Sequence, residues 1–501
     1  MATRPVEVFG YLPVSGRPFH LPLTISERKV LLFLGDAGAM LVTLLAVLRW
    51  RLAAPSPLEL LRSHTLWFGV LVLVWSGCAS LFGIYDLGRA SRYRSSVRDV
   101  MRTAVIACFA YVAIPFVTPA LHNSRLTAAA FLALGPLAVA LWRLTYVAVL
   151  ARPTFRRRVG IVGTNGAGRT MAQVLRQFGR AEYDLVGFIA ANGAGGTDDP
   201  PGPVLGGASE LPEIAQRWRL SELILAHKPS EEGADLVRGI LSCQELGVQM
   251  TSVVGLFERL VGKVPLSRTG GNLQTVLPLD RSRGPSYQLL KRALDVLVAA
   301  AGGAVALLIT PAVVLAHRLE SPGSLFYRQV RVGRFGRLFM VFKFRTMRPD
   351  AEADGPKWAV ENDPRITRTG RWLRRLHLDE LPQAFNILRG DMSLVGPRPE
   401  RPEFVEQLER AIPFYRARHA VRPGLTGWAQ VNFGYANSVD DSLVKFQFDL
   451  YYLKHMSLFL DLFIALQTLG LLLGLGQASV SRPATDDETF DDLVRLARES
   501  A

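Results

Sequence analysis

Four apolar runs within the first 150 residues constrain the fold of this 501-residue chain more than any other feature. An α-helix needs about 20 mostly apolar residues to cross the hydrocarbon core of a bilayer. Three runs are close to that length, and the third is shorter and contains a proline. The runs cover Val30–Leu48, Thr65–Ile84, Ala104–Thr118 and Thr127–Leu150. We therefore predict a four-helix transmembrane bundle over residues 30–150, preceded by a mostly polar N-terminal segment, residues 1–29, without a cleavable signal pattern.

Basic residues around these runs orient the predicted bundle. Thirteen Lys and Arg residues lie on one side, in the N-terminal segment, the second loop and the exit from the fourth run. The opposite side carries four. Because Lys and Arg are enriched in cytoplasmic loops, both ends of the bundle are expected in the cytoplasm. The remainder of the chain then faces the cytoplasm as well.

Overall charge and cysteine content exclude some classes of protein. The net charge is +15, the mean hydropathy is +0.20, and 49% of the residues are hydrophobic. Such a basic chain is suited to nucleic acid, anionic lipid or an acidic substrate. The arginines flank apolar runs and do not form one soluble basic face, so we expect no nucleic-acid partner. Only three cysteines are present, without metal-ligand spacing, so a disulfide framework is not expected.

Residues 151–270 alternate short strand patterns with helical ones. The predicted strands are Arg158–Gly163, Leu185–Ile189, Glu222–Ala226 and Val248–Thr251. This alternation predicts a Rossmann-like parallel α/β domain. Its first turn has the spacing Gly-x-x-Gly-x-Gly, and no acidic residue follows the second strand as a ribose ligand. Two interpretations of the glycines stay open: close packing of strand and helix, or anion binding where the helix begins. A polar linker, residues 271–286, follows.

The later apolar segment Ala293–Ala316 is long enough to span a membrane, but three features disfavour a span. Basic residues flank it on both sides, whereas spanning helices are asymmetric. Pro311 lies within it, lacks an N–H and clashes with the carbonyl of Leu307. A fifth crossing would also place the rest of the chain outside the cell. We therefore predict a re-entrant helix over residues 292–319, kinked or broken at Thr310 and Pro311.

Two adjacent carboxylates, Asp379 and Glu380, lie where a helix is predicted to begin, in a basic stretch. Between Arg318 and Glu380 there are 14 Lys and Arg residues and 8 Asp and Glu residues. Free N–H groups at a helix start favour phosphate. This pattern indicates a site for a phosphorylated anion, with a carboxylate left to do chemistry.

Five basic residues are candidates for binding phosphate. Two alternate with apolar residues in a predicted strand, which places them on one face. One lies on the basic face of a short predicted helix. The last two precede prolines, which restricts their backbone to extended conformations and suits fixed clamping of phosphate oxygens. In this order they are Lys343, Arg345, Arg374, Arg398 and Arg422.

Four motifs together resemble one family. They are Lys-Phe-Arg-Thr-Met from Lys343, Leu-Asp-Glu-Leu-Pro-Gln from Leu378, Gly-Asp-Met-Ser-Leu-Val-Gly-Pro-Arg-Pro from Gly390, and Arg-Pro-Gly-Leu-Thr-Gly-Trp-Ala-Gln-Val-Asn from Arg422. The chain resembles the bacterial sugar transferases, also called polyprenyl-phosphate hexose-1-phosphate transferases, over about residues 287–475. The preceding bundle and Rossmann-like domain resemble the large membrane subtype of this family.

The resemblance implies transfer of a sugar-1-phosphate from a UDP-sugar to undecaprenyl phosphate. Products would be undecaprenyl-diphosphate-sugar and UMP, in the first membrane step of exopolysaccharide, capsule or O-antigen synthesis. It implies Asp379 as the nucleophile, through an aspartyl-phosphosugar intermediate, and Glu380 as a ligand of Mg²⁺. Gln430 and Asn432 are candidates for the substrate pocket. It further implies a homodimer in the bacterial inner membrane, with the catalytic domain facing the cytoplasm. The sugar is left open between glucose, galactose and N-acetylated sugars.

The expected fold class is thus α/β with membrane helices. A C-terminal monotopic α/β catalytic domain, residues 287–481, follows the bundle and the Rossmann-like domain, and a charged tail, residues 482–501, ends the chain. The apolar segment Leu458–Leu475 is expected as an interfacial helix of the catalytic domain.

Two alternatives belong to other functional classes. The chain could be a membrane nucleotide-sugar dehydratase or oxidoreductase that works through its Rossmann-like domain. That would need a second dinucleotide-binding turn with a well-placed Tyr-x-x-x-Lys; Tyr287 and Lys291 have this spacing but no such turn close ahead. It could also be a non-catalytic scaffold for polysaccharide assembly, which loss of the Asp-Glu pair would favour, but the pair is present.

Overall fold

The computed structural model of the chain describes residues 25–52, 56–85, 87–114, 118, 125–150, 156–191, 201–226, 233–266, 284–349, 351, 363–433 and 438–473. Most of the N-terminal segment 1–29 and of the linker 271–286, and all of the tail 482–501, lie outside these residues. The chain divides into two compact units. The first comprises Met1–Leu44, Tyr85–Met101 and Leu134–Thr251, and the second comprises Leu45–Ile84, Arg102–Ala133 and Ser252–Ala501.

The first 150 residues are helical where they are described. The helices are α1 (Ile25–Leu52), α2 (Pro57–Ser63), α3 (Thr65–Phe82), α4 (Leu87–Ala90), α5 (Tyr93–Ala113) and α6 (Arg125–Val149). By length and apolar composition, α1, α3 and α6 are able to cross a membrane, and so is α12 further along the chain. Helix α5 does not meet these criteria, because its first half carries Arg94, Arg98, Asp99 and Arg102. The third predicted crossing is therefore a helix that begins earlier and is more polar than its apolar run suggests.

Buried polar contacts join these helices within each unit. In the first unit, both carboxylate oxygens of Asp36 in α1 accept hydrogen bonds from Arg143 in α6, at 2.9 and 2.6 Å, and both side chains are fully buried. In the second unit, the Tyr111 hydroxyl of α5 donates to the Trp67 carbonyl of α3 at 2.9 Å. Charged groups inside apolar helices are costly unless they are paired. These contacts therefore fix which helix faces meet.

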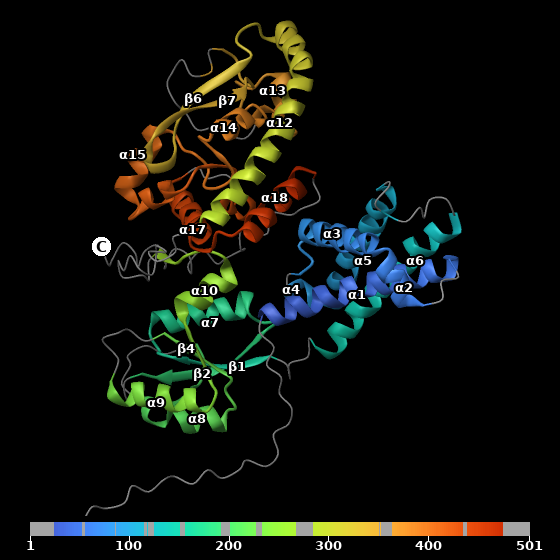
Figure 1. Cartoon of the computed structure of the whole chain (residues 1–501). Helices are drawn as coiled ribbons and strands as arrows, with labels where there is room; N and C mark the ends of the chain where they lie inside the picture. The colour runs from blue at the N-terminus through green and yellow to red at the C-terminus, as the bar shows by residue number, and fades with distance from the viewer. Residues whose placement is uncertain are drawn as a thin grey trace, which may run out of the picture. The chain divides into compact units, whose positions relative to one another are not determined.

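A five-stranded sheet in the order β3-β2-β1-β4-β5 confirms the Rossmann-like prediction. The strands are β1 (Arg157–Val162), β2 (Tyr183–Ala190), β3 (Val204–Gly207), β4 (Glu222–Leu225) and β5 (Gln249–Ser252). The pairs β1–β2, β1–β4 and β2–β3 are parallel. Figure 1 shows α7 (Gly166–Phe178) on one face of the sheet, with α8 (Leu211–Arg217) and α9 (Ala234–Glu245) on the other. Strand β3 was not predicted, because its two glycines follow a Gly- and Pro-rich stretch.

The glycine turn after β1 is used for packing. A Cβ on Gly168 would lie 2.3 Å from the carbonyl oxygen of Gly163, so only glycine fits there. The backbone N–H groups of Ala167 and Gly168 donate to the Asn165 side chain, whose amide donates to the Ala226 carbonyl. The helix start thus satisfies its own donors. This favours the packing interpretation over anion binding and removes support from the oxidoreductase alternative.

The C-terminal part is built around the long helix α12 (Pro285–Glu320). Strands β6 (Phe326–Val332) and β7 (Leu338–Phe344) form an antiparallel hairpin, and β8 (Ser393–Val395) pairs in parallel with β9 (Gly424–Thr426). The remaining helices are α13 (Arg368–Arg375), α14 (Gln383–Arg389), α15 (Pro402–Ala411), α16 (Trp428–Asn432), α17 (Val439–His455) and α18 (Leu458–Leu472), with 3₁₀ turns η7 (Leu378–Glu380) and η8 (Tyr415–Ala420). The mixed α/β class with apolar helices is confirmed.

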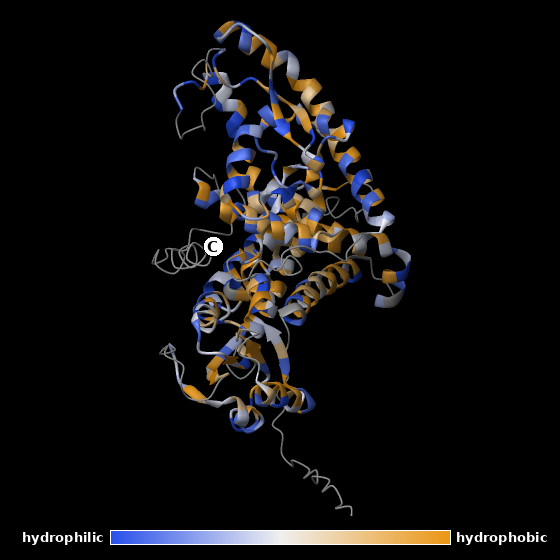
Figure 2. Ribbon diagram, turned by 90° about the vertical axis from the view of Figure 1, so that its left-hand side faces the viewer, coloured by the Kyte–Doolittle hydropathy of each residue, from blue (hydrophilic) through white to orange (hydrophobic). Residues whose placement is uncertain are grey.

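Helix α12 continues through the proline that was expected to break it. Pro311 lies inside a continuous helix, so a break of the helical backbone at Thr310 and Pro311 is wrong, and a kink there stays a prediction. The Thr310 hydroxyl donates to the Ala306 carbonyl at 2.7 Å, and Ala299 and Val313, on either side of the proline, are buried. Packing along one face of α12 thus keeps the segment helical on both sides of Pro311. On its other faces Leu297, Leu307, Leu308 and Leu319 are exposed. Figure 2 colours the ribbon by residue hydropathy.

The segment after β5 packs on the C-terminal part of the chain. Helix α10 (Val253–Val261) places Glu258 2.8 Å from the Lys454 ammonium. The Trp428 indole N–H donates to the Gly262 carbonyl at 2.7 Å, and Val264 is fully buried in a cluster with residues of α15 and α17. The last of the three segments of the second unit accordingly begins at Ser252.

Candidate active site

Asp379 and Glu380 lie in the one-turn 3₁₀ helix η7, between α13 and α14. Pro382 caps the start of α14, so the two carboxylates precede that helix by one turn and are not within it. His377 directly before η7 has φ 53°, a left-handed conformation that is uncommon outside glycine. Sequence reasoning missed this conformation, which turns the chain sharply between α13 and the two carboxylates.

Glu380 is held by two cations. The Lys343 ammonium, from β7, and the Arg398 guanidinium each lie 2.7 Å from the same oxygen, Oε1. The Glu380 side chain is 16% exposed. Burial by itself would raise the pKa of Glu380, but the charges of Arg398 and Lys343 outweigh it and hold that pKa well below the ordinary value. Glu380 is therefore a fixed anion.

Asp379 has the opposite electrostatic bias. Burial and the neighbouring charge of Glu380 raise the pKa of Asp379, and Lys343 and Arg374 only partly offset them. Adjacent carboxylates with pKa values displaced in opposite directions are typical of sites where one group performs chemistry and the other supports it. A carboxylate whose charge is poorly solvated is also a better nucleophile than one surrounded by water.

The loop that carries Arg398 is fixed by main-chain contacts. The Arg418 guanidinium donates to the Arg398 carbonyl at 3.0 Å, and Arg331 donates to the Pro399 carbonyl at 3.0 Å. The Gly424 N–H donates to the Pro397 carbonyl at 2.9 Å. These bonds position the Arg398 side chain toward Glu380 before any substrate binds.

A buried charge network supports that loop, and sequence reasoning missed it. Arg418 pairs with Asp449 at 2.8 Å, and Lys445 pairs with Glu400 at 2.9 Å. Burial by itself would raise the pKa of Glu400, but Lys445, Arg418 and Arg331 bring that pKa down to about 2. A sequence signal was present: Lys445 and Asp449 are spaced i, i+4 inside the mostly apolar middle of α17.

The structure brings three of the five predicted phosphate ligands to the carboxylate pair. Lys343 and Arg398 contact Glu380, and Arg374 is close enough to Asp379 to lower its pKa. The Arg374 Nε also donates to the Thr346 hydroxyl at 2.9 Å, which fixes its direction.

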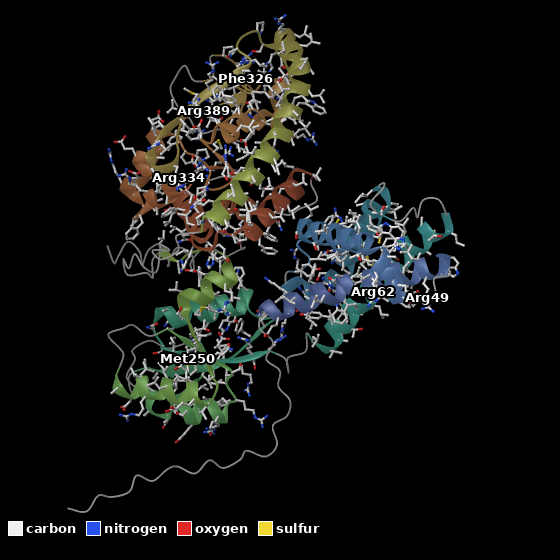
Figure 3. The ribbon with its side chains drawn as sticks, viewed as in Figure 1. Arg49, Arg62, Met250, Phe326, Arg334 and Arg389 are labelled. Atoms are coloured by element: carbon white, nitrogen blue, oxygen red, sulfur yellow. The ribbon has the colours of Figure 1, made fainter. Side chains whose placement is uncertain are left out.

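Arg345 and Arg422 have other surroundings. Every guanidinium nitrogen of Arg345 donates to protein oxygens, of Ser321, Ser324 and Met347, and the residue is 7% exposed. We therefore assign Arg345 to holding the turn after α12. Arg422 lies near two further arginines, Arg292 and Arg334 (Arg334 is labelled in Figure 3); burial and these charges lower its pKa.

The two candidates for the substrate pocket lie in α16 and bind main-chain groups. The Gln430 amide donates to the Leu425 carbonyl at 3.1 Å, and the Asn432 amide donates to the Trp428 carbonyl at 2.9 Å. Asn432 is buried. These bonds shape the segment after β9, and their role toward substrate stays a prediction.

The carboxylate pair fits Mg²⁺ only together with a phosphorylated substrate. Among the described residues, no group of three or more His, Cys, Asp or Glu side chains is arranged to hold a metal. Mg²⁺ commonly takes one or two protein carboxylates and completes its shell with waters and substrate phosphates. Both cations that pair with Glu380 contact its Oε1 atom. The Oε2 atom of Glu380 and the carboxylate oxygens of Asp379 are therefore the atoms suited to the metal.

Comparison with known proteins shows the class to which the chain belongs. The family model described as "Bacterial sugar transferase" matches residues 286–474, and the one described as "CoA-binding domain" matches residues 80–253. A UDP-N-acetylgalactosamine-undecaprenyl-phosphate N-acetylgalactosaminephosphotransferase of Aeromonas hydrophila is 41% identical over 237 residues, which are 47% of this chain and 55% of the relative. This chain thus spans little more than half the length of that relative.

Two further relatives carry related names. A UDP-glucose:undecaprenyl-phosphate glucose-1-phosphate transferase of Escherichia coli is 32% identical over 62% of this chain and 67% of the relative. One with the same name from Caulobacter vibrioides is 42% identical over 42% of this chain and 84% of the relative. The chain belongs to the bacterial sugar transferase family. Its apolar helices and these relatives identify it as a membrane protein.

Proposed function

We propose that the protein transfers a sugar-1-phosphate from a UDP-sugar to undecaprenyl phosphate, releasing UMP, as the first membrane step in building a bacterial polysaccharide. The observation that carries this proposal is the pair Asp379 and Glu380, with one carboxylate clamped by Lys343 and Arg398 and the other left reactive. The names of the relatives supply the substrate class. A homodimer in the inner membrane, expected from the resemblance, is part of the proposal.

The proposed reaction proceeds by two displacements at one phosphorus atom. An Asp379 carboxylate oxygen attacks the sugar-proximal phosphorus of the UDP-sugar, the bond to the bridging oxygen breaks, and UMP leaves with that oxygen. The sugar phosphate is then bound to Asp379 as an acyl phosphate. An oxygen of the lipid phosphate attacks the same phosphorus, and the Asp379 carboxylate is the leaving group. The sugar C1–O bond is never broken, so the anomeric configuration is retained.

The surrounding side chains have separate roles in this scheme. Arg374 and Lys343 would bind phosphoryl oxygens, where their charges compensate the charge that accumulates during transfer. Arg398 keeps Glu380 ionised and directed toward the reacting group. When bound, Mg²⁺ would be held by Glu380 and would neutralise charge on the diphosphate.

The pH dependence of turnover should follow the pKa of Asp379. A carboxylate attacks only when ionised, and burial together with Glu380 raises the pKa of Asp379 above 3.8. The acid limb of kcat/KM should therefore lie above the range of an ordinary aspartate. Arg374→Gln removes a charge that lowers this pKa, so the limb should move to still higher pH, as measured by UMP release across pH. Arg371→Gln, on the same helix and exposed, is the matched control. An unchanged limb in Arg374→Gln would contradict the assignment.

For α12 we propose attachment to one side of the membrane. Near its start, the Lys291 ammonium lies 3.0 Å from Asp461, and the Asp295 carboxylate accepts a hydrogen bond from the Leu394 N–H at 2.8 Å. Near its end, Glu320 accepts hydrogen bonds from the N–H groups of Arg368 and Thr369. Both ends thus contact the same polar domain, although the 36-residue helix is roughly 54 Å long. A helix that crossed the bilayer could not make both sets of contacts.

Cysteine labelling tests this topology. All three native cysteines are buried, which keeps the background low. Ser286→Cys and Ser324→Cys place thiols at exposed positions before and after the apolar part of α12. In intact cells neither should react with an impermeant maleimide, whereas Arg62→Cys, in the loop predicted outside, should react. Labelling of Ser324→Cys without permeabilisation would show that α12 spans the membrane.

Helix α18 is assigned to the membrane interface in the same proposal. It has 15 residues, fewer than the roughly 20 that a crossing requires. Its polar contact through Asp461 to the Tyr452 hydroxyl, at 2.6 Å, fixes it to the catalytic domain, while Phe459 is 81% exposed. A short apolar helix that is tied to the catalytic domain in this way is expected to lie at the interface and not to cross the bilayer.

Product analysis tests the proposed function. The full-length protein in detergent is incubated with undecaprenyl phosphate and, separately, the UDP derivatives of glucose, galactose, N-acetylglucosamine and N-acetylgalactosamine. Release of UMP that depends on the lipid is expected for at least one sugar. Release of UDP in place of UMP would mean that the sugar moves without its phosphate, which would exclude the proposed reaction.

A further inference from the structure

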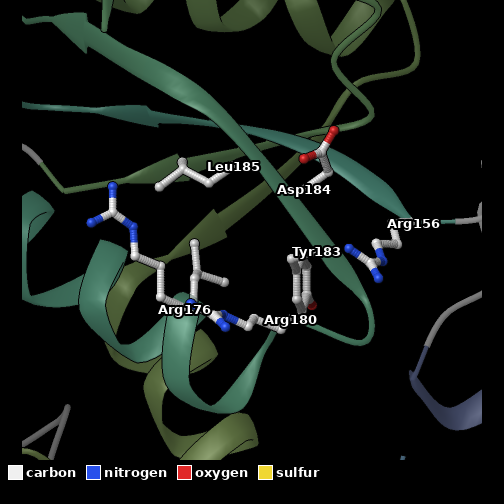
Figure 4. A pocket seen from close by; sticks show the side chains of 7 residues that line it. Arg156, Arg176, Arg180, Tyr183, Asp184 and Leu185 are labelled. Atoms are coloured by element: carbon white, nitrogen blue, oxygen red, sulfur yellow. The ribbon is translucent and has the colours of Figure 1, made fainter. Parts of the chain in front are cut away.

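A cavity of about 490 Å³ lies at the edge of the Rossmann-like sheet where β1 and β2 begin. This is the opposite edge from the glycine turn that follows β1. Its volume is within the roughly 300–1,000 Å³ of small-molecule sites. Figure 4 shows the side chains around the start of β2; the lining consists of Arg156, Leu175, Arg176, Arg180, Tyr183, Asp184 and Leu185.

The lining is strongly basic. It contains three guanidinium groups and one carboxylate, that of Asp184, whose side chain is 57% exposed and lies 3.8 Å from the Arg158 guanidinium on the same strand pair. The Nε of Arg156 is buried and has no hydrogen-bond partner among the described residues. A buried donor without an acceptor costs free energy, and a ligand oxygen would recover it. Planar guanidinium groups match the oxygens of phosphate especially well.

The cavity is next to the start of a candidate membrane helix in the same unit. Arg28, in the first turn of α1, is 1% exposed and donates to the Ala181 carbonyl at 3.0 Å. Ala181 adjoins the lining residue Arg180 in the turn between α7 and β2. The candidate membrane span in α1 begins at Glu27. The basic lining is therefore close to the level at which α1 would enter the membrane.

We propose that this cavity binds a phosphate group, carried by a free phosphorylated small molecule or by the headgroup of an anionic lipid at the membrane surface. The site is separate from the proposed reaction, because every side chain assigned to phosphate transfer lies after residue 340. Arg156 and Arg180 supply the principal contacts, and Arg176, which also donates to the Pro201 carbonyl, closes the third side.

Local arginine modification tests the proposal on the unaltered full-length protein. Phenylglyoxal adducts are quantified by peptide mass spectrometry in neutral detergent with and without pyrophosphate, and in nanodiscs of phosphatidylcholine with and without phosphatidylglycerol. Arg156 and Arg180 should be protected about tenfold at about ten times the dissociation constant. Arg217 and Arg238, on α8 and α9 of the same domain, should react alike throughout. Protection by pyrophosphate identifies a free ligand, and protection by phosphatidylglycerol alone identifies a lipid headgroup. If neither pyrophosphate nor phosphatidylglycerol protects these arginines, the proposal is overturned.

A charge-matched pair of variants shows whether the cavity itself is responsible. In Arg156→Gln/Arg180→Gln, Arg176 should lose its protection. In Arg217→Gln/Arg238→Gln, which removes the same charge elsewhere, Arg176 should keep it. Thermal unfolding by circular dichroism checks the fold; if the cavity variant is unfolded, the protection data on the unaltered protein decide. Equal protection of Arg176 in both folded variants would place the phosphate elsewhere and refute the site.

Discussion

Asp379→Asn should lower lipid-dependent UMP release by at least about 10³-fold, because an amide cannot form the acyl phosphate. The fold should be retained. Burial and Glu380 raise the pKa of Asp379 in the folded protein, so its ionised form opposes folding at neutral pH. A neutral amide of the same size relieves that cost, and the thermal midpoint should stay level or rise.

The control for this variant is Asp235→Asn, the same chemical change at an exposed position on α9. It should leave UMP release and the thermal midpoint unchanged. Mass spectrometry of the Asp379→Asn protein excludes deamidation back to aspartate. Substantial turnover by the intact asparagine variant would show that Asp379 is not the nucleophile.

Arg398→Leu should lower kcat/KM by about 10²–10³-fold, equivalent to roughly 3–4 kcal/mol. The change leaves the Glu380 carboxylate, 16% exposed, with Lys343 as its remaining partner at Oε1. The pKa of Glu380 should rise as a result, and the carboxylate should lose its fixed direction. Arg398→Lys keeps the positive charge but lacks the planar guanidinium with its fixed N–H donors, so an intermediate loss of kcat/KM is expected.

Two comparisons separate this effect from a general loss of charge. Arg410→Leu, on the exposed face of α15, should leave kcat/KM unchanged. Added Mg²⁺ should partly restore Arg398→Leu, because a second cation can replace the lost charge beside Glu380. A loss in Arg398→Lys equal to that in Arg398→Leu, without any effect of Mg²⁺, would indicate that Arg398 acts by geometry alone.

Sequence reasoning predicted the carboxylate pair and most of its cations, because residue type and motif order carry that information. It could not show which cations meet the pair. Lys343 and Arg398 are 37 and 18 residues from Glu380, and only the packing of β7 and of the 396–400 loop brings them together. Arg345 has the same residue type and alternation as Lys343, yet it follows the end of β7 and holds the turn after α12.

The break expected in α12 failed for a related reason. A proline removes one hydrogen bond and disfavours a helix locally, but tertiary packing can outweigh that preference. Here Asp295 and His317 are both buried on the packed face of the helix, and the Thr310 hydroxyl bonds back to Ala306. Strands β1, β2 and β4 of the Rossmann-like sheet, in contrast, were predictable because buried parallel strands are largely continuous apolar runs.

Trapping the covalent intermediate tests the central claim most directly. The full-length protein is incubated with Mg²⁺ and a UDP-sugar labelled at the sugar-proximal phosphate, without lipid phosphate, then quenched and digested. We expect UMP equal to the amount of enzyme and the mass of the sugar phosphate on the peptide that contains Asp379. Adding undecaprenyl phosphate before the quench should remove the label from the protein and transfer it to the lipid. Lipid-dependent turnover with no UMP burst and no label on the Asp379 peptide would contradict the account and indicate direct transfer between the two substrates.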